Sequence, residues 1–201
     1  MKRIYLLPVL ALAIACTNSD NTAGAYADLP ASAVKEPYDD GTGVVRVSVY
    51  DANNAILEQG DYVNGLRQGV YTVYHPNGYI ESTTAYVNGK KEGLYMLLDN
   101  RGQLLESGNY HDGLLEGKYT VYNRSRLKET RHYHQGKLHG AREKFYANGT
   151  TVMERTNYVD GLLDGVARWY DQQGNLTIEY VYKNGELVED KTPIKQEGGS
   201  K

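Results

Sequence analysis

The sequence predicts an all-β repeat protein, a single elongated antiparallel β-meander of about twelve strands built from hairpin units of ~24 residues. Three observations support this prediction. Glycines recur with spacings of 24, 24, 24, 23, 25 and 24, at Gly41, Gly65, Gly89, Gly113, Gly136, Gly161 and Gly185. A tyrosine lies three residues before each of these glycines. Turn dipeptides such as Asn64-Gly65 and Asn77-Gly78 occur twice in several units, and they tolerate the positive φ that tight hairpins require.

The composition agrees with short strands and glycine turns. The 201 residues include 19 Tyr and 22 Gly but only one Phe, one Trp and 5 Pro. A formal net charge of −3 is too small for a general nucleic-acid binder, so no nucleic acid is expected as a partner. The sole cysteine, Cys16, excludes an intrachain disulfide and a multi-cysteine zinc site.

Two other repeat folds have similar periods. Leucine-rich repeats require the pattern Leu-x-x-Leu-x-Leu with an Asn or Cys ladder, which this sequence lacks. A parallel β-helix carries the chain around each coil, whereas tight hairpin turns reverse the chain. The antiparallel meander is therefore the prediction.

The N-terminus is typical of a secretory signal. Lys2 and Arg3 precede an apolar run over residues 4–15, which is shorter than the ~20 residues that span a membrane. The segment Leu12-Ala13-Ile14-Ala15-Cys16 resembles the bacterial lipobox. That resemblance implies a signal peptide at 1–15 and a mature protein that begins at a lipidated Cys16 and is anchored in the membrane of the bacterial cell envelope. Because Thr17 rather than Asp follows, the resemblance favours the outer membrane. The alternative is a secreted protein cut near Ala15 with a free thiol.

Residues 16–37 read as the lipidated cysteine and a flexible tether, since they are rich in small and polar residues without alternation. The repeat domain is expected over residues 38–188, and a disordered polar tail over residues 189–201.

One unit carries a family resemblance. Tyr-x-Asn-Gly-x-x-x-Gly-x-Tyr-x-x-Tyr-x-x-Asn-Gly, from Tyr62 to Gly78, resembles the bacterial variant of the MORN repeat, and the resemblance extends over residues 38–188. Classical MORN units have Gly where this chain has Tyr71, Tyr95 and Tyr119, so the variant is the closer match. The resemblance implies either an antitoxin or immunity component, as many bacterial members are filed, or a scaffold that sometimes binds phospholipids, as eukaryotic members are regarded.

Alternation predicts which residues share a sheet face. The unit tyrosines and a second stripe at Tyr71, Tyr95 and Tyr119 are expected to pack as core, with binding as the alternative role for the tyrosine ladder. In the last hairpin, Trp169 is expected to pair with Ile178.

No arrangement of residues predicts catalysis or metal binding. Equivalent residues lie two strands apart, roughly 10 Å, which is too far for paired catalytic carboxylates or for two ligands of one ion. This applies to the glutamate series Glu58, Glu106, Glu129 and Glu154, and to His111 and His134, with His132 beside the latter. We therefore expect a non-enzymatic protein with no cofactor and no metal.

Residues 124–144 carry a net charge of +5, from seven basic and two acidic residues. Arg142 and Lys144 replace the tyrosine and valine of earlier units. We expect this segment to dock an acidic partner or anionic headgroups, the alternative being a solvated patch. The candidate binding residues are Arg124, Arg126, Lys128, Arg131, Lys137, Arg142 and Lys144.

Three functions follow as hypotheses. The first, which we favour, is a membrane-anchored protein-interaction scaffold; the second is an antitoxin or immunity-like protein that neutralises a toxin. The third, a hydrolase that uses the glutamate series, is disfavoured by the geometry. Open strand edges also make edge-to-edge self-association an expectation.

Overall fold

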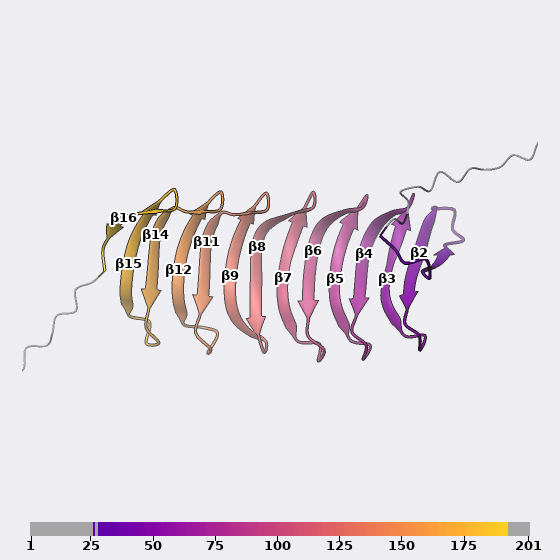
Figure 1. Cartoon of the computed structure of the whole chain (residues 1–201), viewed down its shortest axis with the longest axis horizontal. Helices are drawn as coiled ribbons and strands as arrows, with labels where there is room; N and C mark the ends of the chain where they lie inside the picture. Colours follow the sequence, from indigo (N-terminus) through magenta and orange to yellow (C-terminus); the bar gives the residue numbers. More distant parts are fainter. Residues whose placement is uncertain (1–25, 27, 193–201) are drawn as a thin grey trace, which may run out of the picture.

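The computed structural model describes residues 26 and 28–192, which form one open antiparallel sheet with its strands in chain order (Figure 1). The predicted all-β meander is confirmed. The 16 strands are β1 (Val34–Pro37), β2 (Val44–Tyr50), β3 (Ile56–Val63), β4 (Leu66–Tyr74), β5 (Ile80–Val87), β6 (Lys90–Leu98), β7 (Leu104–His111), β8 (Leu114–Asn123), β9 (Arg126–His134), β10 (Lys137–Leu138), β11 (Gly140–Phe145), β12 (Val152–Val159), β13 (Leu162–Leu163), β14 (Gly165–Tyr170), β15 (Leu176–Lys183) and β16 (Glu186–Asp190).

The strand count exceeds the predicted twelve for simple reasons. The pairs β10/β11 and β13/β14 are each one strand interrupted at a single residue, His139 or Asp164. The strand β16 adds half a unit after the last full one, and β1 forms inside the segment expected to be a tether. The sheet thus begins at Val34, four residues before the expected boundary at residue 38. Cys16 lies outside the described residues.

The strands end along the two long sides of the sheet, and these two sides, which we call its edges, carry different turns. At one edge, which we call the tight-turn edge, two-residue turns such as Asn64-Gly65 have positive φ at both positions, 50° and 77°. This geometry matches the twist of the flanking strands, as expected from the sequence. At the other edge, the loop edge, the expected Asn77-Gly78 turn is part of a five-residue loop that begins at His75, whose amide donates to the Tyr79 carbonyl.

One face of the sheet, the tyrosine face, holds most of the buried side chains. Tyr62, Tyr71, Tyr86 and Tyr119 are buried there. Rings on neighbouring strands meet edge to face, with centroids 6.3 Å apart for Tyr71 and Tyr86 and 5.9 Å apart for Tyr119 and Tyr133. Edge-to-face contact adds to the area that each ring buries. The tyrosine stripes pack on this face as expected, with the exception of Tyr38, the first unit tyrosine, which is exposed. Trp169 pairs with Ile178, also as expected.

Two of the core tyrosines donate their hydroxyl groups to carboxylates. The Tyr71 hydroxyl donates to Glu58 at 2.7 Å, and the Tyr119 hydroxyl donates to Glu106. Burial, together with the carboxylate acceptor, raises the pKa of both tyrosines above the ordinary value. Both phenols therefore stay neutral donors at physiological pH.

The outermost strands leave both ends of the sheet open. All residues of β1 and β16 are exposed, and among the described residues each of these strands pairs on one side only. Edge-to-edge self-association therefore stays a prediction. Within the same residues, no helix has the length and apolarity needed to cross a membrane.

Candidate functional site

The repeat departs from its own spacing at the loop edge, in two adjacent units. In the regular units five residues separate the last paired positions of a hairpin, as between Leu98 and Leu104. At the equivalent paired positions only four residues separate Tyr122 from Leu127, where Asn123 and Arg126 pair as well, and six separate Phe145 from Val152. These two loops produce the spacings of 23 and 25 in the sequence. A short turn therefore lies beside a long loop, and the edge is notched between them.

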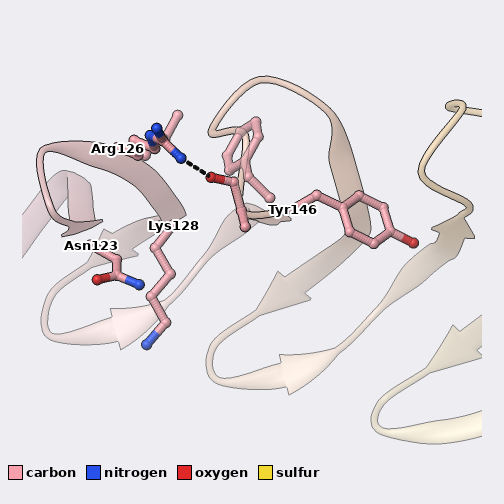
Figure 2. A pocket seen from close by; sticks show the side chains of 7 residues that line it. Asn123, Arg126, Lys128 and Tyr146 are labelled. Carbon is pink, nitrogen blue, oxygen red and sulfur yellow. Dashed lines mark hydrogen bonds between the residues drawn. The ribbon is translucent and has the colours of Figure 1, made fainter.

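The notch is a small hollow of about 130 Å³ (Figure 2). Its walls come from the end of β8, the start of β9 and the long loop, namely Asn123, Arg126, Leu127, Lys128, Phe145, Tyr146 and Ala147. A second hollow of about 240 Å³ shares three of these residues and adds Arg124. Three cationic side chains thus line two adjoining hollows.

Local hydrogen bonds fix the walls of the notch. The short turn at Arg124 and Ser125 has positive φ at both residues, 50° and 60°. In the long loop, Asn148 Oδ1 accepts from the amides of Thr150 and Thr151, both at 3.0 Å. Arg126 Nη1 donates to the Ala147 carbonyl at 3.3 Å, which joins the two loops across the opening (Figure 2).

Gly149 brings the long loop close to the short turn. A β carbon at Gly149 would lie 3.2 Å from Arg126 Cβ and 3.2 Å from the Leu127 amide nitrogen. The φ of Gly149, 75°, also favours glycine. The Tyr146 hydroxyl anchors the same loop by donating to the Tyr170 carbonyl at 2.6 Å. The notch is therefore built from fixed backbone.

The cations at the notch are available to a partner. Arg124, Arg126 and Lys128 are exposed, and within residues 28–192 none of them forms an ion pair. Exposed cations without internal ion pairs can attract an acidic group at little desolvation cost. Figure 2 shows Lys128 and Asn123 extending to the same side of the ribbon, while Arg126 reaches toward the long loop.

Three other basic residues from the sequence analysis lie on the tyrosine face and are neutralised there. Glu129, which is 5% exposed, accepts from Arg131 at 2.7 Å and from Arg142 at 2.6 Å. Lys144 pairs with Glu154 at 3.0 Å. These side chains bond to one another across neighbouring strands, so they stabilise the sheet.

The charge balance of this network is visible in the pKa of Glu129. Burial alone would raise that pKa, but hydrogen bonds from Arg131 and Arg142 outweigh burial and lower it from 4.5 to about 2. Burial acts against the charge of Arg142 as well, yet hydrogen bonds to Glu129 and Tyr158 raise its pKa above the ordinary value. All three groups therefore remain charged at neutral pH.

The seven basic residues thus separate into three places. Arg124, Arg126 and Lys128 line the notch, whereas Lys137 is exposed in β10 beside the tight-turn edge. The other three are in the Glu129–Glu154 network. Sequence reasoning missed the partners of Arg142 and Lys144, although both replace core residues opposite the glutamate series, which is the signal that could have revealed them.

The glutamates and histidines singled out from the sequence have structural partners. Each residue of the glutamate series bonds to a neighbouring strand, Glu58 and Glu106 to tyrosines and Glu129 and Glu154 to cations. His111 lies 2.9 Å from Glu92, and His134 lies 3.0 Å from Glu116. Among the described residues, no three metal-binding side chains form a group that could hold an ion.

The chain is similar to solved structures over about half of its length, and one of its units matches a known repeat family. Two crystal structures of TarM, one of them an S. aureus mutant in complex with fondaparinux, alpha-GlcNAc-glycerol and UDP, are similar to this chain at 15% identity and a TM-score of 0.34. The similarity covers 49% of this chain and 20% of theirs, so the chain spans about a fifth of the length of those proteins. No curated protein matches the chain. Residues 163–184, from the end of β13 through β15, match the family model described as the MORN repeat variant, and the fold is an all-β meander with MORN repeats.

Proposed function

We propose that this protein is a non-enzymatic interaction scaffold, anchored in the bacterial outer membrane through Cys16, that docks an acidic protein at the notch. The observation that carries the proposal is the contrast among the cations of residues 124–144. Those on the tyrosine face are neutralised by Glu129 and Glu154, whereas Arg124, Arg126 and Lys128 surround a hollow without ion pairs among the described residues. An acidic side chain is the complement of such a site.

We propose a non-enzymatic role because the candidate catalytic groups are already bonded to other side chains of the sheet. A general acid or base must be free to reach a substrate. The glutamate series instead bonds to tyrosines and cations inside the sheet. An antitoxin-like role, which the repeat resemblance implies, is the special case in which the acidic partner is a toxin. Headgroup binding is the less favoured alternative.

Reversing the notch charges should abolish partner binding. We expect Arg124→Glu/Arg126→Glu/Lys128→Glu to lose a protein that wild type retains in cross-linked pull-downs from native envelopes, because the variant repels an acidic partner. The control, Lys90→Glu/Lys137→Glu/Lys183→Glu, makes the same charge change at exposed positions near the tight-turn edge. Retention of the same proteins by the notch variant would place the binding surface elsewhere.

Cys16→Ser should release the protein from the membrane. Wild type is expected to incorporate a fatty-acid label and to sediment with outer membranes, since several acyl chains on one cysteine anchor a protein firmly. The variant should incorporate no label and should leave the membrane fraction. An unlabelled wild type would contradict the anchor and favour the secreted form.

A further inference from the structure

The segment before β1 lies across the tyrosine face at the start of the sheet. We call residues 26 and 28–33 the strap. The Tyr26 ring contacts the Tyr62 ring with centroids 5.2 Å apart, and the Tyr26 amide donates to the Gly65 carbonyl at 3.1 Å. Leu29 and Ala33 pack against the same cluster. Tyr62, at 1% exposure, is the most buried tyrosine of the described chain.

Arg67 supplies the polar half of this contact. Its Nη2 lies 2.7 Å from an Asp28 carboxylate oxygen, and its Nε donates to the Tyr62 hydroxyl at 3.1 Å. The guanidinium also lies 4.2 Å from the centroid of the Tyr71 ring. The guanidinium donates to the hydroxyls of both Tyr62 and Tyr86, and these bonds orient it independently of Asp28. Tyr62, Gly65 and Arg67 together form what we call the strap seat.

The strap is held mainly by side chains and not by strand pairing. The chain first pairs with the sheet at Val34, after the strap. Within residues 26 and 28–33, one backbone hydrogen bond reaches the sheet, from the Tyr26 amide to the Gly65 carbonyl. The remaining backbone bonds of the strap are internal turns, from Leu29 to Tyr26 and from Ala33 to Pro30. The Asp28 side chain is 52% exposed. For the strap to leave, one backbone hydrogen bond and one ion pair to the sheet must break, and the side chains of Tyr26, Leu29 and Ala33 must leave the cluster.

A cation stands at the position of Arg67 in the first two full units only. Lys91 stands at the equivalent position of the next unit, but later units have leucine there, at Leu115, Leu138 and Leu163. A leucine could pack on the same face but could not bond to the Tyr62 and Tyr86 hydroxyls or to Asp28, so apolar packing alone does not account for Arg67. A charge at this position is useful where a carboxylate is to be bound.

We propose that the strap seat is a peptide-binding site, that the chain fills it with its own strap, and that a partner segment can take the strap's place. The partner segment carries an aromatic residue followed two positions later by a carboxylate, as Tyr26 and Asp28 do. The aromatic ring stacks on Tyr62 and the carboxylate pairs with Arg67. This site is separate from the notch and depends on no part of the proposed function.

The test uses a fluorescein-labelled peptide of residues 24–33 and the full chain purified in detergent. The double variant Tyr26→Ala/Asp28→Ala vacates the seat without changing the seat itself. We expect this variant to bind the peptide at least tenfold more tightly than wild type, measured by fluorescence anisotropy. In wild type the tethered strap competes at an effective concentration in the millimolar range.

Two altered peptides serve as controls, and because the protein itself is unchanged they cannot unfold it. A peptide with Asp28→Asn and a peptide with Tyr26→Ala should each bind the vacated chain about tenfold more weakly, since each loses one of the two main contacts. Far-UV circular dichroism checks that the vacated chain keeps its sheet. A folded vacated chain that binds the peptide no better than wild type would show that the strap is a permanent cap, which overturns the proposal.

Discussion

Gly108→Ala should destabilise the protein by about 3 kcal/mol, although alanine is ordinarily the better residue inside a strand by about 0.5–1 kcal/mol. The reason is the Tyr119 ring, which lies over the glycine. A β carbon at Gly108 would lie 2.5 Å from Tyr119 Cδ2, closer than such atoms approach in folded proteins. The ring cannot move aside freely because its hydroxyl is bonded to Glu106. Urea unfolding followed by circular dichroism measures the loss.

A double-mutant cycle identifies the cause. In a Tyr119→Ala background the ring is absent, so Gly108→Ala should cost little or should stabilise. Thr84 provides a matched position, because it occupies the place of Gly108 one unit earlier and already has a β carbon. Thr84→Ala should therefore change stability by much less. A Gly108→Ala protein as stable as wild type would show that the ring does not occupy this space.

Glu129→Gln should cost about 3 kcal/mol at neutral pH, because it leaves two charged guanidinium groups without their shared carboxylate. Arg131 and Arg142 both bond to Glu129, and neither is fully exposed. Chemical denaturation at pH 7 measures the effect. Glu186→Gln, at an exposed position of β16, is the control and should be close to neutral.

The same network predicts a pH dependence. The pKa of Glu129 is lowered from 4.5 to about 2 in the folded chain, so its contribution is complete above pH 4.5 and is lost as the pH falls toward 2. That contribution is about 3 kcal/mol. Between these pH values Glu129→Gln should lose less stability than wild type does. Parallel pH profiles for the two proteins would contradict the network.

The fold could be predicted because short segments of the sequence determine it. Turn residues such as Asn64 and Gly65 and the regular tyrosine spacing fix each hairpin to its neighbour in the sequence, so each strand pairs with the next one along the chain. The loop-edge turns were less predictable: Asn77-Gly78 marks a turn but not its length, which depends on how the loop closes on His75.

The sites were only partly predictable, because they depend on contacts between units. The basic segment at residues 124–144 is evident in the sequence, but only the structure shows that Arg142 bonds to Glu129 while Arg126 lies exposed at the notch. The two irregular spacings of the repeat locate the short turn and the long loop. They indicate a hollow only because these two loops are neighbours in the structure. The contact of Asp28 with Arg67 has no periodic signal, and the segment that contains Asp28 reads as a tether.

Site-specific photo-cross-linking shows whether an acidic partner docks at the notch. A benzoylphenylalanine at Asn123 lies in the wall of the notch, and one at Lys137, which is also exposed, lies near the opposite edge. Irradiation of native envelopes should cross-link an acidic protein from position 123 and not from position 137. Cross-linking from position 137 alone, or from neither position while a partner still co-purifies, would contradict docking at the notch.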